Sequence, residues 1–247
     1  MNIRDETVLR ELNLYPLWVR RGVPVTAESA PASPAPIEGA RPEPAVSGEP
    51  VQRQAEAPAT STLNWAELKQ QVHDCTACKL RAGCTQTVFG VGDEKAEWLF
   101  VGEGPGADED AQGEPFVGQA GKLLDNMLAA IKLKRGDNVY IANIVKCRPP
   151  NNRTPEPDEI ATCLPYLQQQ IALIKPKLIV ALGKTAATSL LGREATLGSL
   201  RGTLHDFHGT PLIVTYHPAY LLRSPAEKAH AWEDLQQAVS AMRELKG

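Results

Sequence analysis

The feature that most limits the fold of this chain is an alternation of short apolar runs with amphipathic segments. Apolar runs at 98–101, 139–145, 178–182 and 212–216 are separated by segments whose apolar residues recur at helical spacing. Strands that alternate with helices usually form a parallel sheet with helices on both faces. We therefore expect an α/β protein, a three-layer α/β/α sandwich around a central, mainly parallel sheet of four strands.

Composition divides the chain into three parts. Residues 24–62 are rich in proline and alanine and poor in large apolar side chains, so we expect a disordered linker. Residues 1–23 contain leucines, a tyrosine and a tryptophan followed by two arginines. Two interpretations of 1–23 stand: a motif that docks a protein partner, or a short helix packed on the chain's own core. Residues 63–247 are expected to be the folded domain.

Charge and hydropathy exclude some classes of protein. The net charge of −3 argues against a generally basic polymer binder but permits a local basic groove. The apolar runs are too short to span a bilayer, and the first residues lack the apolar region of a secretory signal. We expect a cytoplasmic, monomeric protein without membrane contacts.

Four cysteines form a pattern typical of metal binding. Cys75 and Cys78 make a C-x-x-C, and Cys147 and Cys163 follow as single residues. Thiolates bind both zinc and iron–sulfur clusters, and this spacing alone does not choose between them. Cys163 also suits the role of a small core residue, although Cys84 suits that role better.

Three polar or glycine-rich loops follow predicted strands, at 102–119, 146–153 and 217–224. In open α/β sheets, ligands bind beyond the carboxyl ends of the strands. We expect these loops to meet at one edge of the sheet and to form the binding site there.

Several motifs in these loops resemble those of one family when they are taken in order. They are GEGPGADED at 102–110, GEPFVG at 113–118, NIVKCRPP at 143–150, NRTP at 152–155 and HPAYLLR at 217–223. The ordered set resembles the family 4 uracil-DNA glycosylases, iron–sulfur members of the uracil-DNA glycosylase superfamily. The resemblance covers 64–244 and leaves 1–60 unmatched.

The resemblance implies a cofactor and a reaction. The cofactor is a [4Fe-4S] cluster on Cys75, Cys78, Cys147 and Cys163, with Cys84 as a bystander. The reaction is the removal of uracil from single- or double-stranded DNA, which leaves an abasic site. Such an enzyme must take the base out of the stack and hold it in a pocket.

Five residues are expected to form that pocket. Gly102 and Gly104 permit close approach of the backbone, and Phe116 supplies a flat face for the base. The amide of Asn143 matches uracil O4 and N3–H, whereas cytosine presents the opposite pattern. The resemblance gives His217 the role of donating to uracil O2 as charge develops on the leaving base. The alternatives are a core phenylalanine, an amide that fixes a loop, and a histidine that satisfies a local carbonyl.

A second group of residues is expected to hold the DNA. Apolar side chains can enter a base step, so Leu221 or Leu222 is a candidate wedge, unless they simply begin the core of the last helix. The basic residues beside the pocket are expected to grip phosphates; they are Lys146, Arg148, Arg153, Arg201 and Arg223.

The residue that positions the hydrolytic water is not evident. Other branches of the superfamily carry an aspartate where this chain has Gly104. Glu103, Glu109 and Asn152 are the candidates, although Glu109 also suits the acidic start of a helix. If positioning and charge stabilisation suffice, loss of any one carboxylate should slow the reaction and leave measurable activity.

Two other functions compete with this interpretation. One is a non-catalytic iron–sulfur module that binds nucleic acid and recruits a polymerase or repair partner through residues 1–23. The other is the related branch that becomes covalently trapped on uracil-DNA. That branch carries an inserted Lys-Arg-Arg-Ile-His string, which this chain lacks.

Overall fold

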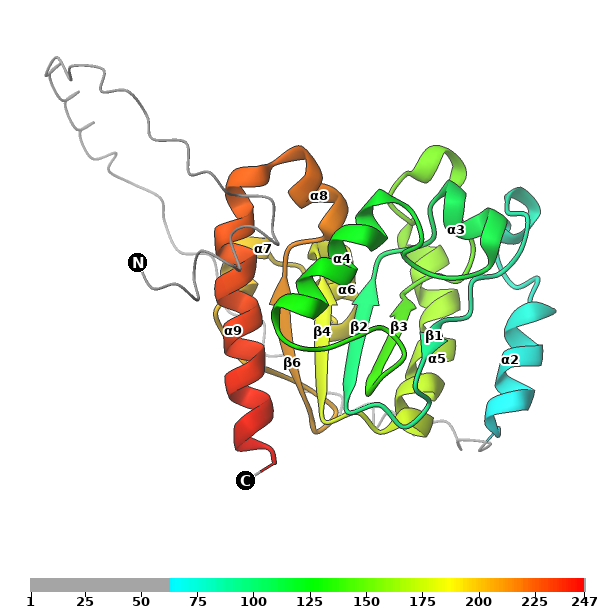
Figure 1. Ribbon diagram of the computed structural model, residues 1–247. Helices are drawn as coiled ribbons and strands as arrows, with labels where there is room; N and C mark the ends of the chain where they lie inside the picture. Colours follow the sequence, from blue (N-terminus) through cyan, green and yellow to red (C-terminus); the bar gives the residue numbers. More distant parts are fainter. Residues whose placement is uncertain (1–62, 247) are drawn as a thin grey trace, which may run out of the picture. The chain divides into compact units, whose positions relative to one another are not determined.

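A six-stranded sheet runs through residues 63–246, the part of the chain that the computed structural model describes (Figure 1). The strand order is β1-β3-β2-β4-β6-β5. Parallel pairing joins β2 (Trp98–Gly102), β3 (Val139–Asn143), β4 (Leu178–Leu182) and β6 (Thr210–Thr215). Every residue of β2, β3 and β4 is buried, as expected for a parallel sheet covered on both faces.

The predicted α/β sandwich with a parallel centre is confirmed, but the predicted number of strands is wrong. Two short antiparallel strands, β1 (Val91–Gly92) and β5 (His205–Phe207), add one edge each. They are too short to leave an apolar run in the sequence. β5 reaches β6 through His208 and Gly209, both with positive φ (48° and 88°), which is typical of a tight hairpin turn.

Helices cover both faces of the sheet (Figure 1). Apolar side chains of α4 and α9 pack against Phe100, Ile141 and Val180 on one face. Those of α5, α6 and α7 pack against Leu99 and Ile179 on the other. The α-helices are α2 (Trp65–His73), α3 (Ala107–Gln112), α4 (Gln119–Ala130), α5 (Pro157–Ile174), α6 (Lys184–Leu191), α7 (Leu197–Leu200), α8 (Pro218–Arg223) and α9 (Lys228–Glu244). Short 3₁₀ turns are η1 (Lys79–Gly83), η2 (Pro150–Asn152) and η3 (Pro225–Glu227).

Local signals explain where several helices begin. Asn64 and Glu67 form the predicted capping box at the start of α2. Proline stands at the first position of α5 and of α8, where its missing N–H costs nothing. Within 63–246, no helix is both long and apolar enough to cross a membrane. The predicted peptide 1–23 and linker 24–62 lie outside the described residues.

Candidate active site

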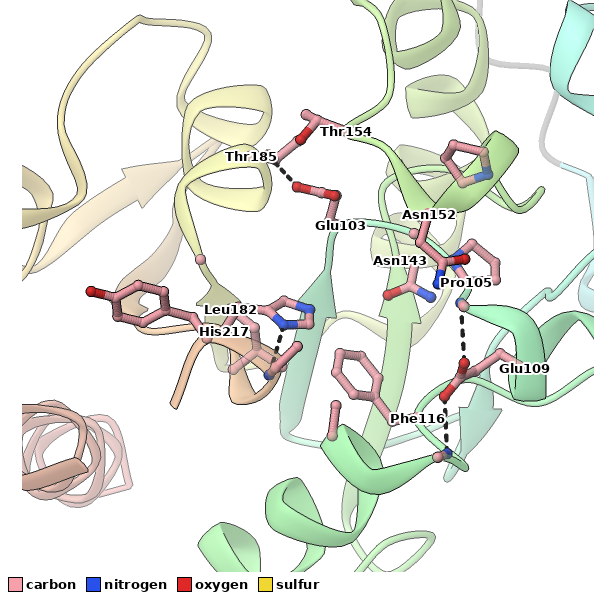
Figure 2. Close-up of a pocket in the computed structure, with 18 of the residues that line it drawn as sticks. Glu103, Pro105, Glu109, Phe116, Asn143, Asn152, Thr154, Leu182, Thr185 and His217 are labelled. Carbon is pink, nitrogen blue, oxygen red and sulfur yellow. Dashed lines mark hydrogen bonds between the residues drawn. The ribbon is translucent and has the colours of Figure 1, made fainter. Parts of the chain in front are cut away.

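A cleft of about 860 Å³ opens at the carboxyl ends of the parallel strands. Its walls come from the segments that follow β2, β3, β4 and β6, so all three loops expected at this edge contribute. Figure 2 shows side chains from these segments pointing into the same space. The order of strands in the sheet therefore assembles groups that are more than 100 positions apart in the sequence.

Asn143 lies at the floor of this cleft, at the end of β3, with only 2% of its surface exposed. Its Oδ1 accepts no hydrogen bond within the described part of the chain. A buried polar group left unsatisfied costs about 1–3 kcal/mol, so a bound N–H donor would relieve a real penalty. Gly102 makes room for Asn143: a Cβ at Gly102 would overlap Asn143 Oδ1 and lie 2.5 Å from Phe116 Cζ.

Phe116 forms a second wall of the cleft and is held in a strained conformation. Its φ of 57° lies in the left-handed region, which costs free energy for a residue with a side chain. Arg135 holds the turn, because its Nη1 donates to Pro115 O and its Nη2 to Phe116 O, each at 2.8 Å. Sequence reasoning missed Arg135, since nothing distinguishes it from the other basic residues near it.

His217 faces Phe116 across the cleft, with 5.5 Å between the ring centroids (Figure 2). Its Nδ1 accepts the backbone N–H of Ala219 at 3.1 Å, so in the neutral ring the proton lies on Nε2. Burial, followed by the charge of Arg223, lowers the pKa of His217 to about 4. The imidazole is therefore a neutral donor at neutral pH.

Glu109 has both carboxylate oxygens occupied by the protein itself. Oε1 accepts from the N–H groups of Val117 and Gly118 at 2.9 and 3.1 Å, and Oε2 accepts from that of Gly106 at 3.1 Å. Glu109 thus joins the loop after β2 to the turn that follows Phe116 (Figure 2).

In Figure 2, Glu103 points toward Thr185, whereas Asn152 lies near Asn143. Glu103 Oε2 accepts from Thr185 Oγ1 at 2.5 Å, and Oε1 has no such partner among the described residues. Asn152 Oδ1 accepts from Arg148 Nε at 2.7 Å. A Cβ at Gly104 would lie 2.8 Å from Val145 Cγ2, so a larger residue does not fit there without a shift.

Lys146 is buried, which makes its expected phosphate contact wrong. Only 1% of its surface is exposed, and its Nζ donates to Asn143 O at 2.9 Å and to Gln170 Oε1 at 2.6 Å. Burial lowers the pKa of Lys146 to about 8. Its side chain points inward from the segment after β3 and supports the backbone of Asn143.

Two of the predicted phosphate-binding arginines have carboxylate partners inside the protein. Arg153 binds Glu159 through two contacts of 2.8 and 2.7 Å. Arg201 binds Asp234 through contacts of 2.7 and 3.0 Å. Both carboxylates are buried, so neither arginine is a free cation. Arg148 and Arg223 remain: Arg223 is exposed, lines the cleft and forms no ion pair with another described residue.

The two candidate wedge residues, Leu221 and Leu222, differ in how much of their surface is exposed. Leu221 is 1% exposed and packs with Leu123, Met127 and Leu235, so the prediction that it enters DNA is wrong and the core alternative holds. Leu222 is 44% exposed and stays a candidate. In the short helix α8, Leu221 therefore faces α4 and α9, whereas its neighbour Leu222 faces solvent.

The four predicted cysteine ligands line one small cavity, together with Lys146 and Tyr166. Burial raises the pKa of Cys163, to about 11, and of Cys147. Neighbouring cysteines add to both shifts, and Cys84 is a hydrogen-bond partner of Cys147. Among residues 63–246, no group of three or more cysteines, histidines or carboxylates is arranged to hold a metal ion as it stands.

The fold and the cleft together define a class: an α/β sandwich with a cleft at the carboxyl edge of a mainly parallel sheet. A family model described as the uracil DNA glycosylase superfamily matches residues 89–236. The chain is 45% identical over 177 residues to a protein of Thermotoga maritima named type-4 uracil-DNA glycosylase, covering 70% of this chain and 92% of the relative.

Two further proteins of the same name have similar sequence identity to this chain. The one from Pyrobaculum aerophilum is 44% identical over 181 residues, covering 70% of this chain and 92% of the relative. The one from Archaeoglobus fulgidus is 45% identical over 167 residues, covering 64% and 83%. This chain belongs to the uracil-DNA glycosylase superfamily, in its type-4 family.

Proposed function

We propose that this protein removes uracil from DNA by hydrolysing the N-glycosidic bond, leaving an abasic site. The observation that carries the proposal is Oδ1 of Asn143, which accepts no hydrogen bond from residues 63–246 and is buried in the same cleft as Phe116 and His217. A flipped uracil offers the N–H donor that this oxygen lacks. The three relatives described above, each named type-4 uracil-DNA glycosylase, support the same substrate.

The cleft can read the edge of the extruded base. Uracil stacks on Phe116 while Asn143 accepts from N3–H and donates to O4. Cytosine has an acceptor at N3 and a donor at N4, so both contacts become repulsive and it is refused. His217 Nε2–H reaches toward O2 from the opposite wall.

Bond cleavage places negative charge on the leaving base and positive charge on the sugar. The electron pair of the C1′–N1 bond leaves with uracil, and His217 stabilises the charge that develops on O2. Glu103, whose Oε1 accepts no hydrogen bond from the described residues, supplies negative charge near the sugar and an acceptor for the attacking water. The oxygen of the water bonds to C1′, and the proton that this water loses replaces the lost bond on the uracil anion, which yields the abasic site and free uracil.

The test is an assay of abasic sites with the full-length protein. Single- and double-stranded oligonucleotides with one uracil should both yield abasic sites and free uracil, detected by mass spectrometry. Oligonucleotides with thymine or cytosine at the same position should yield none. Binding of DNA without any product would instead favour a non-catalytic nucleic-acid-binding module.

Glu109→Ala tests which carboxylate serves the reaction. Three N–H groups lose their acceptor, so the free energy of unfolding should fall by about 1–3 kcal/mol and the turn after Phe116 should loosen. Excision should slow but remain measurable. Urea unfolding and kcat/KM check both effects, with Glu109→Gln as the control that keeps one acceptor oxygen. Complete loss of activity with unchanged stability would assign Glu109 a direct catalytic role.

The same proposal includes a [4Fe-4S] cluster on Cys75, Cys78, Cys147 and Cys163. The donor set fits, because four sulfurs from three segments line one cavity and thiolates are the usual cluster ligands. Bound there, the cluster would tie the segment of Cys75 and Cys78 to the segments of Cys147 and Cys163, and so fix the position of Arg148.

Cys163→Ala should show whether Cys163 is a cluster ligand or only a core residue. Wild type purified without oxygen should be brown and carry about four iron atoms per chain. Cys163→Ala should lose most of that iron and unfold at a lower temperature. Cys84→Ala, a change of another buried cysteine, should keep the iron content and the unfolding temperature of wild type. A colourless, zinc-loaded and fully active wild type would overturn the cluster.

Location and partners follow from the proposed reaction. We place the protein in the cytoplasm, where DNA is accessible and thiols stay reduced, acting as a monomer on single- or double-stranded DNA. Residues 63–247 form the glycosylase domain, 24–62 a linker and 1–23 a docking peptide. Deleting 1–62 should leave excision intact and abolish capture of a protein partner; if partner binding is also unchanged, the docking role is wrong.

A further inference from the structure

Tyr220 is an exposed aromatic residue in the wall of the cleft, separate from the Phe116 pocket. It lies on α8, three residues after His217, and 39% of its surface is exposed. Its ring stacks on that of Tyr216, with 5.5 Å between centroids and 9° between the planes. Stacking on Tyr216 occupies only one face of the ring.

The ring behind Tyr220 is fixed by a chain of polar contacts. The guanidinium carbon of Arg201 lies 4.5 Å from the centroid of Tyr216. Arg201 is itself held by the buried carboxylate of Asp234 and by His230 O, at 2.8 Å. The hydroxyl of Tyr216 also bonds to Glu227, which raises the pKa of Tyr216. Tyr220 therefore rests on a rigid base, and little freedom is lost when something stacks on it.

We propose that Tyr220 is a stacking site for the nucleobase next to the flipped uracil on the same strand. This rests on the proposed glycosylase function and adds a second base subsite to it. A planar heteroaromatic ring is the ligand that an exposed, pre-organised phenol face suits, and every base has such a face. Arg223, an exposed cation on the same helix, lies where it can meet the adjoining phosphate.

The proposal gives a physical role to Arg201. Its guanidinium does not reach phosphates, because Asp234 occupies it. Instead, it stabilises the Tyr216 ring on which Tyr220 stacks. Binding of single-stranded DNA should gain most from the site, since its bases are not already stacked on a partner strand.

Binding of a non-cleavable substrate tests the site. The probe is a single-stranded oligonucleotide of about eleven nucleotides with a central 2′-fluorinated deoxyuridine, which resists hydrolysis. Tyr220→Ala should bind it about 5- to 150-fold more weakly, the range measured for loss of one stacked base. Tyr220→Phe should bind as wild type does. Leu173→Ala, a change of another exposed apolar side chain, is the matched control and should have no effect.

A second probe separates stacking from a structural role. Abasic spacers replace the neighbour of the uridine on one side and then on the other. Wild type should lose affinity for one of these two probes, and Tyr220→Ala should lose no more when the same base is removed. If Tyr220→Ala binds the first probe like wild type, or if it is weaker than wild type by the same factor on both spacer probes, the stacking site is wrong. Failure of wild type to excise uracil would instead refute the proposed function.

Discussion

Asn143→Asp should lower kcat/KM for uracil in DNA by about 10⁴-fold, as expected when a site built around specific hydrogen bonds meets the wrong pattern. Aspartate has nearly the same shape as asparagine, but its carboxylate donates no hydrogen bond. It would therefore place negative charge against uracil O4 while still accepting from N3–H. Steady-state excision from a single-uracil oligonucleotide measures the effect.

Stability measurements show whether Asn143 acts on the substrate or on the fold. Oδ1 of Asn143 accepts no hydrogen bond within 63–246, so the side chain is retained at a cost to the free protein. Asn143→Leu removes that unsatisfied group at similar volume. The free energy of unfolding should stay the same or rise, while excision is lost. A large loss of stability with parallel loss of activity would make Asn143 a structural residue.

His217→Ala should reduce kcat by about 10²- to 10³-fold, the usual effect of losing one donor aimed at a developing anion. His217→Gln should recover part of the rate, because an amide N–H can replace Nε2–H. A quench assay under single-turnover conditions isolates the chemical step. If His217→Ala changes only KM, the imidazole binds uracil without stabilising the transition state.

The pH dependence follows from the same group. The pKa of His217 is lowered from 6.5 to about 4, so the neutral donor is present at all pH values above about 5. The chemical step should show no change near pH 6.5 and should alter only as pH approaches 4. A break at pH 6.5 would mean that the imidazole is not shielded as the structure describes.

The lowered pKa of His217 also sets how the free energy of unfolding should change with pH. A histidine whose folded pKa is lowered binds its proton more readily in the unfolded chain. Its contribution to stability is complete above pH 6.5 and is lost as pH falls from 6.5 toward 4. The difference in stability between wild type and His217→Ala should therefore change over that interval and not above it.

The sequence by itself determined the layers of the sheet and the edge at which the site lies. The runs at β2, β3, β4 and β6 are apolar because a parallel strand covered on both faces must be, and that property is visible in a few consecutive residues. The loops that follow parallel strands must meet at one edge. The strands β1 and β5 are too short to produce an apolar run, so the sequence did not predict them.

The tertiary structure alone decided which way each side chain points. Leu221 lies between two exposed residues in the sequence, yet it packs inward against α4 and α9. Lys146 is a charged residue in a cleft-edge segment, yet its side chain points inward to Gln170 of α5. Glu109 is held by three backbone N–H groups from two loops, and Arg135 reaches Phe116 from another turn. Such orientations depend on atoms brought together by folding, because a side chain at the end of a strand takes its direction from its neighbours in space.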